Sequence, residues 1–112
     1  MTELIWILPL ALLAVLWFKG RGASRAQLQA LMARKAQLVD VRTPAEFAGG
    51  HAPGTVNIPL DQLATRAREL DKARPVLCCC ASGSRSAMAT SLLKAKGFEA
   101  VNAGPWGKLL QL

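Results

Sequence analysis

The stretch that decides the fold is residues 75–86, which read Pro75-Val76-Leu77-Cys78-Cys79-Cys80-Ala81-Ser82-Gly83-Ser84-Arg85-Ser86. Its apolar first half is typical of a short buried strand, and the spacing after Arg85 predicts a helix over residues 86–96. The small polar loop between them places the last cysteine, Cys80, beyond the carboxyl end of a strand, where ligands bind in open α/β sheets. Backbone N–H groups and the positive end of a helix dipole lower the pKa of a thiol in that position. We therefore expect Cys80 to be a nucleophile.

The other two cysteines of the run have a different interpretation. Cys78 and Cys79 lie inside the apolar segment, so we expect them to be small hydrophobic residues of the strand. Three consecutive cysteines form no disulfide framework, and no Cys-x-x-Cys pair is present to suggest a metal site. Free thiols favour a reducing compartment. One alternative stays open, which is redox sensing through a strained vicinal disulfide between Cys79 and Cys80.

The sequence around this unit alternates between strand and helix patterns. We expect helices over residues 24–35, 43–48, 60–71 and 86–96, strands over 37–42, 55–58, 76–79 and 99–102, and a turn with a short helix over 104–110. Such alternation predicts an α/β fold in which a parallel β-sheet is flanked by helices on both faces.

The loop after Cys80 has the composition of an anion-binding nest. Its side chains are small, and Gly83 is free to adopt any φ, so backbone N–H groups can turn inward. Arg85 is expected just before the helix, where its planar guanidinium would face an anion held over the loop. The candidate substrate-binding residues are therefore Ala81, Ser82, Gly83, Ser84, Arg85 and Ser86.

Four further polar residues are candidates for supporting roles. His51 is the only histidine; a Cys–His pair is one interpretation, and a hydrogen-bonded structural histidine in a loop is the more common one. Asp40, Arg42 and Glu46 follow or end the first strand. We expect them to form a network that braces the strand end, with acid–base roles as the alternative.

The N-terminus carries a separate signal. Residues 4–18 contain no charged side chain, whereas Lys19, Arg21 and Arg25 follow directly. As a helix this segment would extend over roughly 22 Å, so with its flanks it comes close to spanning a bilayer. We predict a single transmembrane anchor over residues 1–19 in the inner (cytoplasmic) membrane, a linker over 20–24 and a domain over 25–112. The positive-inside rule places that domain in the cytoplasm. A cleaved signal peptide, with a periplasmic domain, is the alternative.

The charge balance limits the class of partner. The formal net charge is +7, which suits a small anionic substrate, an anionic membrane surface or nucleic acid. No Cys/His finger spacing or aromatic-rich strand pair is present, and there is no tyrosine at all. We therefore expect no nucleic-acid partner. The oligomeric state is left open.

Four segments together resemble the single-domain form of the rhodanese-like family. They are Leu38-Val39-Asp40-Val41-Arg42 with Pro44-Ala45-Glu46-Phe47; Gly50-His51-Ala52-Pro53-Gly54 with Asn57-Ile58-Pro59; Cys80 to Ser86; and Gly97-Phe98 with Val101-Asn102-Ala103-Gly104. The likeness covers about residues 24–110.

This resemblance implies a sulfurtransferase. It implies that Cys80 attacks the outer sulfur of a donor anion such as thiosulfate and becomes a persulfide, whose sulfur then passes to a thiol, cyanide or a protein. It implies no metal and no organic cofactor. The four residues between Cys80 and Arg85 match the sulfur-handling members of the family, since the phosphatase relatives have five. A membrane-tethered rhodanese-like binding or redox-sensing module with little catalysis is the alternative.

Overall fold

The computed structural model describes residues 22–112 and has a four-stranded, fully parallel β-sheet at its centre. The strand order is β2-β1-β3-β4, so the strand that ends in Cys80 lies between two neighbours. The strands are β1 (Gln37–Asp40), β2 (Thr55–Asn57), β3 (Val76–Cys80) and β4 (Ala100–Pro105).

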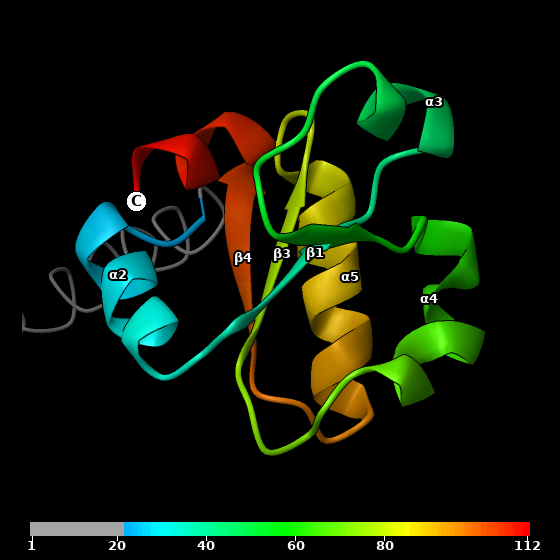
Figure 1. The fold of residues 1–112 in the computed structure, drawn as a ribbon. Helices are drawn as coiled ribbons and strands as arrows, with labels where there is room; N and C mark the ends of the chain where they lie inside the picture. The colour runs from blue at the N-terminus through cyan, green and yellow to red at the C-terminus, as the bar shows by residue number, and fades with distance from the viewer. Residues whose placement is uncertain (1–21) are drawn as a thin grey trace, which may run out of the picture.

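Helices cover both faces of this sheet (Figure 1). They are α2 (Arg25–Ala33), α3 (Pro44–Ala48), α4 (Leu60–Arg66), η1 (Ala67–Glu69), α5 (Ser84–Ala95) and η2 (Trp106–Gln111). Side chains of α4, η1 and α5 pack on one face in the larger core cluster, and those of α2 and η2 pack on the other. The predicted parallel α/β architecture with helices on both faces is confirmed.

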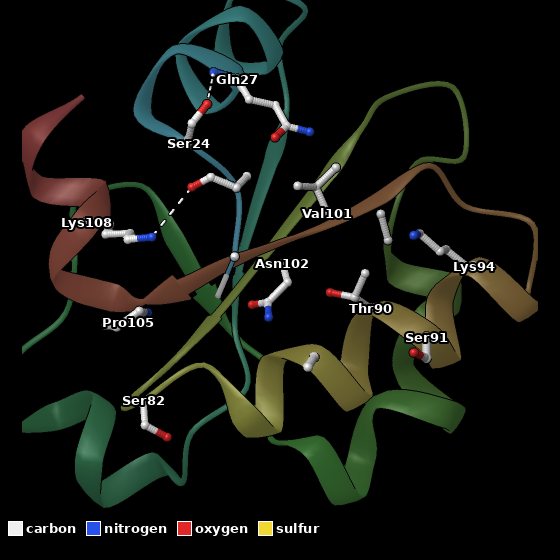
Figure 2. A pocket seen from close by; sticks show the side chains of 14 residues that line it. Ser24, Gln27, Ser82, Thr90, Ser91, Lys94, Val101, Asn102, Pro105 and Lys108 are labelled. Carbon is white, nitrogen blue, oxygen red and sulfur yellow. Dashed lines mark hydrogen bonds between the residues drawn. The ribbon is translucent and has the colours of Figure 1, made fainter. Parts of the chain in front are cut away.

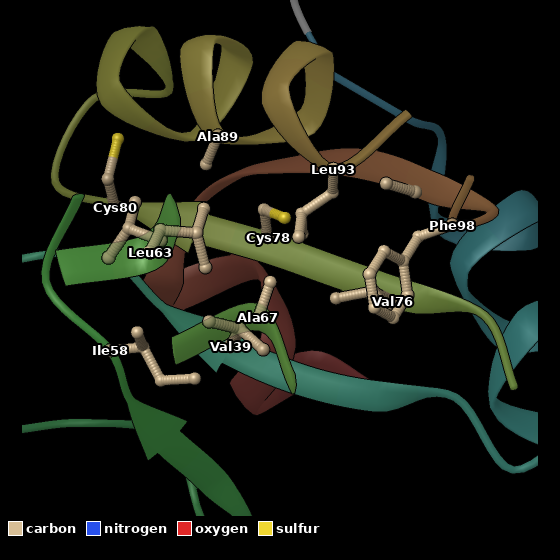
Figure 3. Packing of buried hydrophobic residues seen from close by; sticks show 12 residues of the cluster. Val39, Ile58, Leu63, Ala67, Val76, Cys78, Cys80, Ala89, Leu93 and Phe98 are labelled. Atoms are coloured by element: carbon tan, nitrogen blue, oxygen red, sulfur yellow. The ribbon is translucent and has the colours of Figure 1, made fainter. Parts of the chain in front are cut away.

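Strand β3 is buried on both faces, which explains its continuous apolar sequence. Successive side chains of a strand point to opposite faces. Cys78 and Cys80 accordingly belong to the cluster beneath α5 (Figure 3), and Cys79 belongs to the cluster beneath α2 and η2.

The ends of several elements differ from the sequence-based expectation. The helix expected from residue 86 begins at Ser84, because Gly83 takes a left-handed conformation (φ +104°) and completes the turn before it. Strand β1 ends at Asp40 instead of Arg42, since the Arg42 N–H donates to the Asp40 carboxylate at 3.0 Å and turns the chain. The last strand, β4, continues to Pro105. Its pairing with β3 shifts register between Cys78 and Cys79, opposite Asn102 and the left-handed Gly104.

The prediction of one continuous helix over residues 60–71 is also wrong, because the α-helix ends at Arg66. This segment divides into α4 and the 3₁₀ turn η1, and Leu70 is already extended. The tighter turn keeps Ala67 buried in the larger core cluster.

The predicted transmembrane anchor, residues 1–19, lies outside the described residues. Within residues 22–112, no helix combines the length and the apolar character needed to cross a bilayer. Ala23, in the segment assigned to the linker, is buried and donates its N–H to the Asn102 carbonyl at 2.8 Å.

Candidate active site

Cys80 ends β3 beneath the first turn of α5, with its side chain fully buried in this structure. The Gly83 N–H donates to its Sγ at 3.0 Å, and the Ser86 N–H does so at 3.4 Å. The Ser86 hydroxyl lies 3.3 Å from the same sulfur. N–H groups in the first turn of a helix have no partner within the helix, so they are available to a sulfur or an anion at this position.

These donors distinguish the three thiols. Burial on its own raises the pKa of Cys80, but hydrogen bonds from the Ser86 hydroxyl and from the N–H groups of Ser86, Gly83 and Ser82 outweigh it and lower that pKa below its ordinary value. Burial raises the pKa of both Cys78 and Cys79 to about 12. Cys80 is therefore the thiol whose surroundings stabilise a thiolate.

The strand geometry opposes the vicinal-disulfide alternative. Cys79 and Cys80 are both free thiols and their side chains point to opposite faces of the sheet. Joining them would require the carboxyl end of β3 to leave its pleated conformation.

Asn102 on β4 fixes the loop around Cys80, and we did not single it out from the sequence. Its Oδ1 accepts hydrogen bonds from the Ser86 hydroxyl at 2.7 Å and from the Gly104 N–H at 2.9 Å, and its Nδ2 donates to the Gly83 carbonyl at 3.2 Å. The available signal was an amide that ends the strand expected over residues 99–102, two residues before Gly104. Asn102 thus orients the hydroxyl that contacts the Cys80 sulfur.

We expected the Arg85 guanidinium to face an anion over the loop, but in the structure it is held in an ion pair with Glu46. Arg85 lies in the first turn of α5, and its Nη1 and Nη2 donate to Glu46 Oε1 and Oε2 at 2.7 and 2.9 Å. The guanidinium has five N–H donors, so this pair leaves others for an anion. Hydrogen bonds from the Arg85 side chain and the Thr43 backbone lower the pKa of Glu46 to about 2.

Asp40 and Arg42 form the predicted brace, but Glu46 joins it differently. Asp40 is fully buried and accepts hydrogen bonds from Arg42 at 2.8 to 3.0 Å. Arg42 also donates to the carbonyls of Glu46 (3.3 Å) and Gly50 (2.7 Å) and lies 4.8 Å from the Trp106 ring centre. The Glu46 carboxylate binds Arg85 instead of Arg42. The network therefore ties β1, α3 and η2 together.

His51 is exposed and has a structural partner. Its Nδ1 lies 2.8 Å from the Phe47 carbonyl and its ring stacks on the Phe47 ring with centroids 3.7 Å apart. This agrees with the interpretation as a hydrogen-bonded loop histidine rather than as a partner of Cys80.

Comparison with known proteins identifies the family. The sequence profile described as "Rhodanese-like domain" matches residues 24–103. The chain belongs to the rhodanese-like domain family. It is 41% identical over 61 residues to a sulfurtransferase of Allochromatium vinosum (54% of this chain, 57% of that protein) and 37% identical over 75 residues to the thiosulfate sulfurtransferase GlpE of Pseudomonas syringae (67% and 71%). A solved rhodanese-related protein from Thermoplasma volcanium superposes with a TM-score of 0.69 at 27% identity, covering 81% of this chain and 91% of that one.

The alignments cover only part of the length of some curated relatives. With two Bacillus subtilis proteins they cover 51% and 35% of the relative's length. This chain therefore spans about half, or less, of the length of these two curated relatives. The part of the chain that the structure describes contains no group of three His, Cys, Asp or Glu side chains arranged to hold a metal ion.

Proposed function

We propose that this chain is a sulfurtransferase that carries a sulfane sulfur on Cys80, with thiosulfate as a donor. The observation that carries the proposal is the pair of N–H groups, from Gly83 and Ser86, that reach the Cys80 sulfur at 3.0 and 3.4 Å. These groups stabilise a thiolate before the reaction and a persulfide anion after it.

In the first half-reaction the Cys80 thiolate attacks the outer sulfur of thiosulfate. A new S–S bond forms to that sulfur, and the original S–S bond breaks with its electron pair leaving on sulfite. The donor is an anion, and the chain offers the Arg85 N–H groups that Glu46 does not occupy, together with the first-turn N–H groups of α5.

In the second half-reaction an acceptor takes the sulfur. A thiolate or cyanide attacks the terminal sulfur of the persulfide, and the Cys80–S bond breaks with its electron pair returning to the Cys80 sulfur. The acceptor becomes a persulfide or thiocyanate, and the Gly83 and Ser86 N–H groups again stabilise the leaving thiolate. All electrons move between sulfur atoms and the acceptor, so the cycle consumes no organic cofactor.

The test is transfer of sulfur from thiosulfate to cyanide by the purified full chain. Thiocyanate should form, and Cys80→Ser should abolish its formation, whereas Cys78→Ser should retain it because that thiol is buried with a pKa of about 12. If Cys80→Ser still forms thiocyanate at the wild-type rate, the proposed nucleophile is wrong. A Cys80→Ser variant with full biological activity would favour a binding module instead.

We also propose that residues 1–19 anchor the domain in the inner membrane, with a single pass and the domain in the cytoplasm. The support is the uncharged run of residues 4–18, followed directly by Lys19, Arg21 and Arg25. A C-terminal reporter fusion tests this. Activity of a reporter that works only in the cytoplasm agrees with the proposal, and activity of one that works only in the periplasm contradicts it.

A further inference from the structure

A groove of about 1070 Å³ runs alongside β4 and reaches the loop that follows Cys80. Figure 2 shows its walls, which are α5 on one side and the start of α2 with η2 on the other. Ser82, in the loop that follows Cys80, lies at one end of the groove, and Lys94, in the last turn of α5, lines it farther along that helix. From Ser84 to Lys94 the helix rises about 15 Å. The groove therefore leads from the Cys80 loop along the length of α5.

The charge of the groove has one sign. Fourteen residues line it; two of them, Lys94 and Lys108, are basic, and none is acidic. Lys94 is exposed at the C-terminal end of α5. A groove with cationic side chains and no carboxylate favours an anionic ligand.

The remaining lining suits a polypeptide backbone. Gln27 and Ser91 are exposed and present an amide and a hydroxyl group, which can hydrogen-bond to peptide groups. Ala87 and Ala100 leave room that larger side chains would fill. A volume of about 1070 Å³ is at the upper limit of small-molecule pockets, so an extended segment of small residues fills it better than one compact ligand.

We propose that this groove binds an extended, acidic segment of a polypeptide sulfur acceptor, and that the segment leads the acceptor nucleophile to the Cys80 persulfide. The proposal rests on the proposed sulfurtransferase function. Ser82 connects the two sites, because it lines the groove and belongs to the loop whose N–H groups surround the Cys80 sulfur.

Binding is tested first, without catalysis. The probe is a fluorescein-labelled peptide of alternating aspartate and glycine that ends in cysteine, and its anisotropy is measured with the reduced full chain. Lys94→Glu should weaken binding about tenfold or more by placing like charges together, whereas Lys94→Arg should bind as the wild type does. Lys96→Glu is the matched control, since it makes the same charge change on an exposed residue that does not line the groove.

A steric variant makes the same test without a change of charge. Ser91→Trp should fill the groove and also weaken binding about tenfold or more. Met88→Trp is its control, because Met88 lies on the same helix, is 63% exposed and does not line the groove. Equal affinities of Lys94→Glu and Lys96→Glu, or of Ser91→Trp and Met88→Trp, would overturn the proposal. So would equal binding of a lysine–glycine peptide, or full displacement of the probe by a single-stranded oligothymidine at the same charge concentration.

Transfer is tested second, with the unlabelled acidic peptide as acceptor of sulfur from thiosulfate. Lys94→Glu should lower kcat/KM for the peptide about tenfold or more while the rate of persulfide formation on Cys80 stays the same. If kcat/KM for the peptide does not change, the groove does not serve the acceptor. If no donor forms a persulfide on the wild type, the proposed function fails, and the anisotropy measurements still decide whether the groove binds acidic peptides.

Discussion

The Arg85 guanidinium forms a bidentate ion pair with the Glu46 carboxylate, with Nη1–Oε1 at 2.7 Å and Nη2–Oε2 at 2.9 Å. This pair joins the first turn of α5, which follows the Cys80 loop, to α3, whose backbone is held in turn by Arg42. Both ends of the loop are therefore fixed, one by strand β3 and the other by a charged contact with a separate helix. The pair also sets how Arg85 is oriented when a donor anion arrives.

Glu46 should make the stability of the protein sensitive to acid. Its pKa is about 2 in the folded protein and 4.5 in its ordinary state, so the unfolded chain binds more protons between these values. The contribution of ionised Glu46 to the stability of the fold is present above about pH 4.5 and is lost as the pH falls toward about 2. Thermal unfolding of the full chain at a series of acidic pH values measures this.

In Glu46→Gln the same acid-dependent loss of Tm should be smaller than in the wild type, because the carboxylate that titrates is gone. The substitution should also raise the KM for thiosulfate, since Arg85 loses the contact that orients it. An unchanged acid dependence together with an unchanged KM would contradict a positioning role for Glu46.

The Ser86 hydroxyl should contribute directly to the low pKa of Cys80. Ser86→Ala removes a hydroxyl 3.3 Å from the sulfur, whose single hydrogen is shared between Asn102 Oδ1 and a Cys80 thiolate. A hydrogen bond to a charged group is worth about 1.5–3 kcal/mol. We expect the midpoint of the pH profile of Cys80 alkylation by iodoacetamide to rise by about one pH unit or more. The rate at neutral pH should fall accordingly.

The matched control for this measurement is Ser84→Ala. Ser84 lies in the same first turn of α5, but it is exposed and its hydroxyl contacts that of Ser82 at 3.1 Å rather than the sulfur. Its alkylation profile should coincide with that of the wild type. Equal shifts in both variants would mean that the Ser86 hydroxyl has no specific effect on the thiolate.

Removal of one partner of the Asp40–Arg42 pair should lower the free energy of unfolding more than removal of both partners. Asp40 is fully buried, and Arg42→Met would leave its carboxylate without a counter-ion. Breaking such a pair costs about 3–5 kcal/mol, while replacing both partners costs much less. Urea unfolding should therefore show a larger loss of the free energy of unfolding for Arg42→Met than for the double variant Asp40→Asn/Arg42→Met. The reverse order would contradict this account of the pair.

Local patterns in the sequence were sufficient to predict the parallel α/β fold and to place Cys80 at the carboxyl end of a buried strand. The period of two along a strand separates Cys79 from Cys80, and the apolar run identifies β3 as a buried strand. The capping box at Thr43 and Glu46 fixes the start of α3, and both of its hydrogen bonds are present. These features depend on residues within one turn or strand of each other.

Contacts between residues far apart in the sequence could not be predicted from local patterns. Glu46 is 39 residues from Arg85, and Asn102 is 16 residues from Ser86. A carboxylate in a capping box already has a local role, so nothing in its neighbourhood predicts that it also binds an arginine on another helix. The early start of α5 was missed for a different reason, because it depends on the left-handed φ of Gly83, which glycine permits but does not require.

The most direct test of the central claim is the mass of the reduced full chain after incubation with thiosulfate, followed by localisation of the added sulfur in peptides. The account predicts a gain of one sulfur atom, about 32 Da, on Cys80. The gain should be absent in Cys80→Ser and retained in the double variant Cys78→Ser/Cys79→Ser. Sulfur bound to Cys78 or Cys79, or no added sulfur on the wild-type chain with any sulfane donor, would contradict the account.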